Sequence, residues 1–242
     1  MPMRLHSVPV IVLGNAPHLP VDDLPHLSSA FTIGVNRILL SGFEPTVVVY
    51  NDVAMIEHIE SIWDTTNALI VKTSKVEGPA HAWLKRFSQR DAKRFPCRGR
   101  TFLQHNTGAA AIRWARGLTR ASIYSLGIST RHDDGPQHFH GESILGGHTF
   151  LRMLKELGEF RAMSNVHMRY TVDEIPQMHR SVQWSQNELR SMVLSAIGSY
   201  NWDQVFCDRD MFERRHAHDQ DHRQEVEAAE QHQHGTSSCR DG

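Results

Sequence analysis

The sequence lacks the cysteine patterns that staple secreted domains or hold structural zinc. Its three cysteines, Cys97, Cys207 and Cys239, are widely separated, and none belongs to a CxxC pair. Neither a disulfide framework nor a cysteine-based zinc or redox site is indicated. A reducing compartment is the simplest setting, so we expect a cytoplasmic protein, in the host cytoplasm if the chain is viral.

Long hydrophobic runs are missing too. The apolar stretch near the N-terminus, Val8–Leu13, has six residues and is interrupted by Pro9. A bilayer-spanning helix needs roughly 20 apolar residues. We therefore expect neither a signal peptide nor a membrane anchor at this end, and no later segment predicts a span.

The chain has no excess of charge of one sign. It carries 26 Lys and Arg against 27 Asp and Glu, a formal net charge of −1, and the basic residues are spread along the sequence. A nucleic-acid-binding protein usually gathers basic residues on one face, so a duplex-gripping role is not indicated. Neither a GxGxxG fingerprint nor a Walker lysine follows the first apolar run.

Short β-branched apolar runs, bounded by turn residues, alternate with amphipathic helical patterns. The apolar runs predict buried parallel strands at Val10–Leu13, Phe31–Val35, Thr46–Tyr50, Ala68–Val71 and Ser122–Leu126, with a further strand in Val166–Val172. The helical patterns are at Ala54–Trp63, Pro79–Phe87, Thr107–Leu118, His148–Leu157 and Gln186–Ile197. This alternation predicts an α/β fold, a Rossmann-like, doubly wound, mostly parallel sheet with flanking helices.

The domain organisation follows from length and composition. With 242 residues, 40% of them hydrophobic, the chain can build one sizeable core, and we expect one domain at 1–207. Residues 208–242 have almost no large apolar side chains and predict a flexible, disordered or loosely helical tail. The tail histidines are either solvated or share a metal; they are His216, His218, His222, His232 and His234.

Polar residues follow three successive predicted strands. Gly14 and Asn15 come after the first strand, Asn36 after the second, and Asn51 and Asp52 after the third. Ligands of open α/β sheets bind at the carboxyl ends of strands. The first turn can face an anion with its N–H groups, and Asn15 can read a base or ribose; an ordinary turn is the alternative. Three equivalent strand ends together favour a binding site.

Two of the candidate positions suit phosphate chemistry. Asp52 is a candidate ligand of Mg²⁺ or Mn²⁺ or a partner of a ribose hydroxyl, and it also suits the N-cap of the next helix. Asn106, Thr107 and Gly108 open the helical pattern at Thr107–Leu118, where N–H groups and the helix dipole favour a phosphate. The alternative is that these small residues allow close packing, with Asn106 or Thr107 as a simple cap.

A polar loop at 127–147 follows the fifth predicted strand. His138 and His140 in it titrate near neutrality, so either can act as a general base on an acceptor hydroxyl or as an acid towards a leaving phosphate. Asp133, Asp134 and Glu142 are near enough in sequence to orient them. A transition-metal site and incidental surface histidines are the alternatives.

Six short motifs occur in a recognisable order: GNAPHL, TIGVNRI, EPTVVVYND, NTGAAAIRWA, SIYSLGIS and QHFHG. Over residues 8–145 the chain resembles the DUF115 and MptE-like group, named for an archaeal 6-hydroxymethylpterin diphosphokinase. That group is distantly similar to the bacterial sialyltransferases of glycosyltransferase family 42, and phage genomes carry short relatives.

The resemblance implies a Rossmann-like domain in which Gly14, Asn15, Pro17 and Asn36 hold a nucleotide. By the same resemblance Asp52 matches the acidic residue after the third strand, Thr107 and Gly108 lie near the donor phosphates, and His138 is the base. Two positions depart from the group's pattern. His18 stands where a Ser is usual and Ser129 where an Asp is usual, which weakens any transfer of specificity.

We therefore expect a transferase that uses a nucleotide-activated donor, most simply a glycosyltransferase acting from a nucleotide sugar on a hydroxyl acceptor. An ATP-dependent diphosphokinase of the 6-hydroxymethylpterin type is the alternative enzyme, and a non-catalytic nucleotide-binding accessory protein is the alternative from another class. The expected partner is a nucleotide or nucleotide sugar. The sequence indicates neither the donor base nor the acceptor nor the oligomeric state.

Overall fold

The computed structural model describes residues 5–51, 55–73, 79–84, 86–87, 101–102, 107–128, 139 and 163–198. The chain divides into two units, Met1–Ile197 and Gly198–Gly242. The helix predicted at 148–157 and the predicted tail at 208–242 lie outside the described residues.

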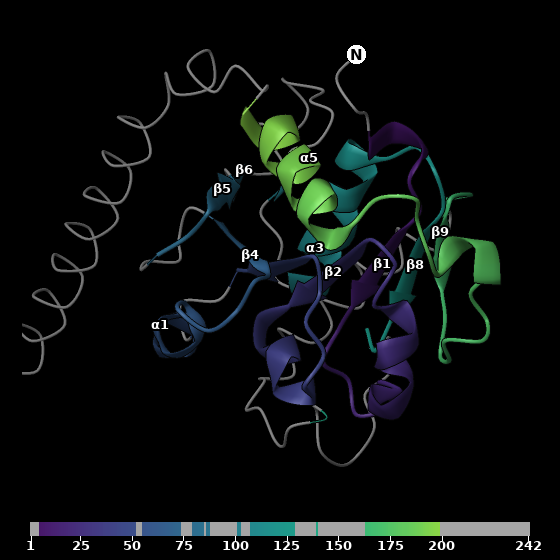
Figure 1. The fold of residues 1–242 in the computed structure, drawn as a ribbon, viewed down its shortest axis with the longest axis horizontal. Coiled ribbons are helices and arrows are strands. Elements are labelled where there is room, and N and C mark those ends of the chain that lie inside the picture. The colour runs from purple at the N-terminus through teal and green to yellow at the C-terminus, as the bar shows by residue number, and fades with distance from the viewer. Residues whose placement is uncertain are drawn as a thin grey trace, which may run out of the picture. The chain divides into compact units, whose positions relative to one another are not determined.

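Seven parallel strands form the main sheet, in the order β5-β4-β3-β2-β1-β8-β9 (Figure 1). They are β1 Val10–Leu13, β2 Thr32–Val35, β3 Val47–Tyr50, β4 Leu69–Thr73, β5 Ala82–Leu84, β8 Ile123–Leu126 and β9 Val166–Met168. A separate parallel pair joins β6, Arg86–Phe87, to β7, Thr101–Phe102. The predicted α/β fold with a parallel sheet is confirmed, and β3-β2-β1-β8-β9 follows the Rossmann order.

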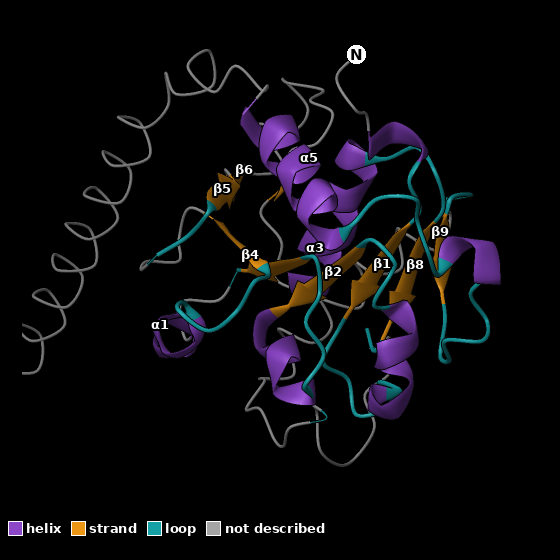
Figure 2. Ribbon diagram, viewed as in Figure 1, coloured by secondary structure: helices purple, strands orange, loops and turns teal. Residues whose placement is uncertain are grey.

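Helical elements cover both faces of the sheet (Figure 2). They are the α-helices α1 Ile56–Ile62, α3 Thr107–Leu118 and α5 Gln186–Gly198, and the 3-10 helices η1 Leu5–Ser7, η2 Val21–Leu27, η3 Asn36–Ser41 and η5 Gln177–His179. On one face the core joins Ile11 and Leu13 of β1 to Leu24, Ile38 and Ile59 of η2, η3 and α1. Helix α3 contacts β1, β2, β3 and β8. Within the described ranges no helix is long and apolar enough to cross a membrane.

Most of the predicted elements are confirmed, and one is wrong. Each apolar run contains the strand that was predicted there, and α1, α3 and α5 match three predicted helices. Pro79–Phe87 was predicted as a helix, but it contains β5 and β6. The N–H of His81 donates to the Ile70 carbonyl (2.9 Å), and β5 then pairs with β4. The open edge of β4 therefore overrides the local helical preference of this segment.

The strand order reverses between β1 and β8, and two glycines allow these strands to end in contact. The N–H of Gly14 donates to the Leu126 carbonyl (2.8 Å), and the N–H of Ala16 donates to the Gly127 carbonyl (2.8 Å). A Cβ on Gly14 would overlap the Gly127 carbonyl oxygen. Gly127 itself has a φ of +62°, which favours glycine. The turn after β1 is thus fixed against the end of β8.

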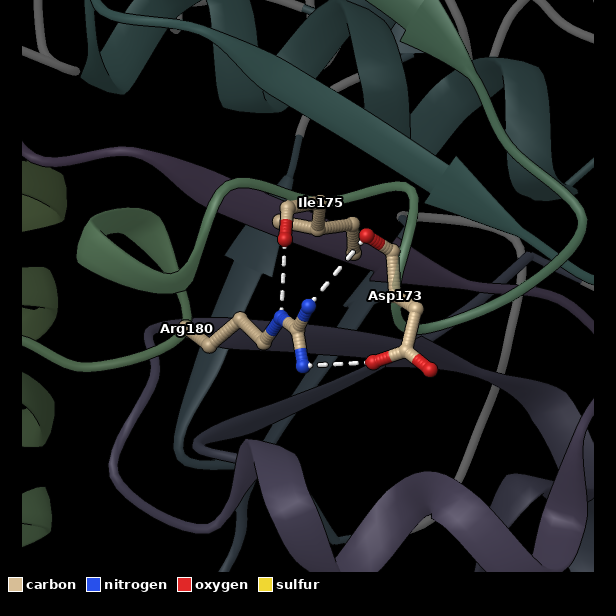
Figure 3. Close-up of polar contacts among 3 residues, drawn as sticks. All are labelled: Asp173, Ile175 and Arg180. Carbon is tan, nitrogen blue, oxygen red and sulfur yellow. Dashed lines mark hydrogen bonds and ion pairs between the residues drawn. The ribbon is translucent and has the colours of Figure 1, made fainter.

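In the segment after β9, one arginine side chain holds a turn by three hydrogen bonds (Figure 3). The Arg180 guanidinium donates to the Ile175 carbonyl (2.7 Å), to the Asp173 carbonyl (3.2 Å) and to the Asp173 carboxylate (2.9 Å). Val172 and Ile175 are buried in the same core cluster as β1 and β8. The three contacts therefore hold the turn whose apolar residues close this end of the core.

Gly14→Ala should destabilise the protein by about 3 kcal/mol, because the new methyl group overlaps the Gly127 backbone, which cannot move aside as a flexible side chain would. Gly42→Ala is the matched control, because Gly42 has a φ of +78° but nothing lies within 4 Å of an added Cβ. That variant should cost only about 1–2 kcal/mol. Urea denaturation of both variants checks the difference; equal losses would contradict the close approach of β1 and β8.

Folding stability should fall as the pH drops below about 6.5, the ordinary pKa of histidine. Nδ1 of His81 accepts the Ile70 N–H (3.0 Å), and burial lowers the pKa of His81, so its neutral form belongs to the folded state. His81→Asn supplies a carboxamide acceptor that does not titrate. Denaturation between pH 7.5 and 5 should show the variant losing less stability than the parent, by at most about 1 kcal/mol. Identical pH profiles would contradict this assignment.

Candidate functional site

The candidate site lies at the carboxyl ends of the strands, where the order reverses between β1 and β8 and where open α/β sheets bind their ligands. The turn after β1, the first residue after β2 and the first residue of α3 meet there. They contribute Asn15, Asn36 and Thr107. One hydrogen bond joins Asn15 to the end of β2, and a second joins Asn36 to Thr107 at the start of α3. Three of the residues predicted from separate motifs thus lie in one region.

Asn15 is held in one orientation by β2. Its side chain is 8% exposed, and Nδ2 donates to the carbonyl of Val35 at 3.0 Å. Because a carbonyl only accepts, this bond fixes which end of the carboxamide is the nitrogen. The opposite atom, Oδ1, is buried and has no hydrogen-bond partner among the described residues. Asn15 therefore has a buried, unused acceptor at the candidate site.

Asn36, which follows β2, also has a bonded side-chain nitrogen and an unsatisfied side-chain oxygen. Its Nδ2 donates to the Thr107 hydroxyl at 3.2 Å, and its buried Oδ1 has no partner in the part of the chain that the structure describes. It is also the one non-glycine residue with a positive φ in that part, at 47°. Such a backbone conformation costs free energy and is concentrated at functional sites. The strained residue links the end of β2 to the start of α3.

The two asparagines together leave a pair of buried oxygen acceptors. Each nitrogen is used within the protein, and each Oδ1 is left over. An unsatisfied buried acceptor costs about 1–3 kcal/mol. A ligand that offers O–H or N–H groups to both oxygens would recover that free energy. Ribose hydroxyls and the amino groups of bases are donors of this kind.

The start of α3 suits both roles predicted for it. Thr107, Gly108 and the three alanines that follow are buried, so close packing of small residues is part of their role. The first N–H groups of any α-helix have no acceptor within the helix. The N-terminus of the 12-residue α3, next to the Asn36–Thr107 bond, would therefore favour an anion.

The remaining predicted residues are distributed differently. Pro17 is exposed on the turn after β1, Gly14 is the buried residue against Gly127, and Asn51 is buried after β3 and has an interaction of its own. The predicted residues Asp52, Asn106, His138 and His140 lie outside the described residues, so their catalytic and metal-binding roles stay predictions. Within the described ranges no group of three His, Cys, Asp or Glu could hold a metal.

Two contributors to the site, Gly127 and the carbonyl of Val35, were not predicted from the sequence. The Gly127 carbonyl accepts a hydrogen bond from the turn that contains Asn15, and the Val35 carbonyl orients the Asn15 amide. A glycine directly after each of two strands was the signal for Gly127, since such pairs allow backbones to approach closely. No sequence signal pointed to Val35, because it acts through its backbone.

Asn36→Gly should be more stable than Asn36→Ala by about 1 kcal/mol. Both variants lose the bond to Thr107, but only alanine has to adopt the left-handed backbone at this position. Denaturation of the two variants under the same conditions measures the difference. If alanine were as stable as glycine, residue 36 would not have a positive φ in solution.

The comparisons with known proteins leave the family open. No protein-family model matches this sequence, and no curated protein matches it. The resemblance to the MptE-like group therefore rests on the six motifs alone.

Proposed function

We propose that the chain is a transferase that uses a nucleotide-activated donor, and that the reaction is glycosyl transfer from a nucleotide sugar to a hydroxyl acceptor. The observation that carries the proposal is the pair of buried, unused acceptors on Asn15 and Asn36. They lie where open α/β sheets bind their ligands, beside the start of a helix. A nucleotide combines the donors and the negative charge that these two features favour.

In this proposal the two parts of the nucleotide have separate partners. The Oδ1 atoms of Asn15 and Asn36 accept hydrogen bonds from ribose hydroxyls or base amino groups. The N–H groups at Thr107 and Gly108 face a phosphate. The bond from Asn36 to Thr107 at 3.2 Å couples the two parts and supports their belonging to one site.

The acceptor is activated by His138 or His140 in this proposal. Phe139, which lies between them in the sequence, donates its N–H to the Asn15 carbonyl at 2.9 Å. Its ring is partly buried against the core. This contact supports a base that comes from the chain next to the nucleotide turn. A divalent ion on Asp52 would screen the phosphates.

The proposed reaction is a single displacement at the anomeric carbon of the donor sugar. The histidine takes the proton of the acceptor hydroxyl while its oxygen attacks the anomeric carbon of the donor sugar. The bond from that carbon to the phosphate oxygen breaks, and the phosphate leaves with the electron pair. Positioning of donor and acceptor and stabilisation of the leaving group by α3 supply most of the catalysis.

Thermal unfolding against CMP, CDP, UDP, GDP, ADP and ATP, with and without Mg²⁺ or Mn²⁺, tests the proposal. A ligand at about 100 times its Kd adds roughly 2.7 kcal/mol to the stability. We expect stabilisation by a nucleotide of the CMP, UDP or GDP type. Asn36→Gly should reduce the shift because it removes one acceptor, whereas Asn187→Ala on the exposed side of α5 should retain it.

The outcomes separate the candidate functions. Stabilisation by ATP with Mg²⁺ alone would replace glycosyl transfer by diphosphate transfer. No shift with any nucleotide, or a full shift in Asn36→Gly, would contradict the nucleotide site itself.

A further inference from the structure

Tyr50, the last residue of β3, carries a buried hydroxyl that the proposed reaction does not use. Its side chain is fully buried, and its hydroxyl has no hydrogen-bond partner among the described residues. Burial raises the pKa of Tyr50 well above its ordinary value, so the group stays a neutral donor. Phenylalanine would fill nearly the same volume without a buried, unsatisfied hydroxyl. A hydrogen-bond acceptor for this hydroxyl would therefore stabilise the protein.

His58 on α1 has the same property and lies opposite. Its Nε2 is buried and has no partner within the described ranges. The centroids of the Tyr50 and His58 rings are 6.2 Å apart, and the ring planes are inclined by 58°. Two unsatisfied polar atoms thus belong to neighbouring rings of different elements. One small polar group that contacts both would satisfy them together.

The charges of the described residues near the two rings favour an anion. Burial, and then the positive charge of Arg37 on η3, lower the pKa of His58. Lys72 of β4 is in register with Tyr50 and is fully buried as well, although it has an interaction of its own and we assign it no role. The acidic residues of α1, Glu57 and Glu60, are exposed. Among the described residues, this position therefore has a hydroxyl and an imidazole in neighbouring rings, and the positive charge of Arg37 is near enough to act on the imidazole.

We propose that Tyr50 and His58 bind a compact oxyanion, a phosphate or carboxylate group, with Arg37 supplying the opposite charge. The site lies at the carboxyl end of β3 and against α1, on residues other than those of the candidate nucleotide site. Its existence does not depend on the proposed transferase reaction. An acceptor that carries such an anionic group would have its anchor here.

Tyr50→Phe separates a ligand site from a merely structural hydroxyl. In chloride buffer the variant should be as stable as the parent or more stable, because it removes an unsatisfied buried group. Added inorganic phosphate or acetate, at constant ionic strength, should raise the melting temperature of the parent, with the stronger of the two naming the kind of anion. We expect Tyr50→Phe to weaken that anion's apparent affinity at least tenfold. Tyr170→Phe, at an exposed tyrosine, is the matched control and should respond like the parent.

Histidine NMR gives a local readout. Sulfate, whose charge is constant near neutrality, should raise the pKa of His58 because the anion stabilises the imidazolium. The pKa of His167, which burial on β9 also lowers, is the internal control and should not respond. The response of His58 should persist in Asn36→Gly, which separates this site from the nucleotide site.

Two results would overturn the proposal. The first is a loss of stability in Tyr50→Phe without added anion, which would mean that water or His58 already satisfies the hydroxyl. The second is a His58 that sulfate, phosphate and acetate shift no more than His167.

Discussion

The backbone contact between the ends of β1 and β8 sets the geometry on which the candidate site depends. Gly14 donates to the Leu126 carbonyl, and no side chain fits between Gly14 and Gly127. This contact is at the reversal of strand order, so it fixes the position of the turn after β1 at the candidate site. The Asn15 side chain then reaches the Val35 carbonyl of β2. A larger residue at position 14 would displace the whole turn.

Several groups at the carboxyl ends of β1, β2 and β3 have unsatisfied hydrogen bonds or an unfavourable backbone conformation. Asn15 and Asn36 leave buried oxygens without partners, Asn36 has a left-handed backbone, and the Tyr50 hydroxyl is unsatisfied. Such features persist only where the surrounding structure determines them, here the core cluster beneath β1, β3 and β8. Sites that bind ligands are preorganised in this way, since the ligand restores the hydrogen bonds that folding leaves unmade.

The periodicity of apolar residues was sufficient to predict six of the seven strands of the main sheet and the helices α1, α3 and α5, because buried parallel strands are short, continuous and β-branched. It was not sufficient at Pro79–Phe87, where the edge of β4 determines the structure. For the site, polar residues after strands predicted Asn15 and Asn36. Their pairing with Val35 and Thr107 was beyond prediction, because these bonds join residues 20 and 71 positions apart. Tyr50 lies within the EPTVVVYND motif but was given no role there, His58 belongs to no motif, and only the fold brings their rings together.

The most direct test of the central claim is to map nucleotide binding onto the folded chain by amide NMR. A stabilising nucleotide is titrated into uniformly ¹⁵N-labelled protein, and both backbone and asparagine side-chain signals are followed. We expect the largest shifts at Gly14, Asn15, Asn36, Thr107 and Gly127, together with protection of the Asn15 and Asn36 side-chain amides. Shifts confined to other elements, such as α5 or the turn after β9, would contradict it.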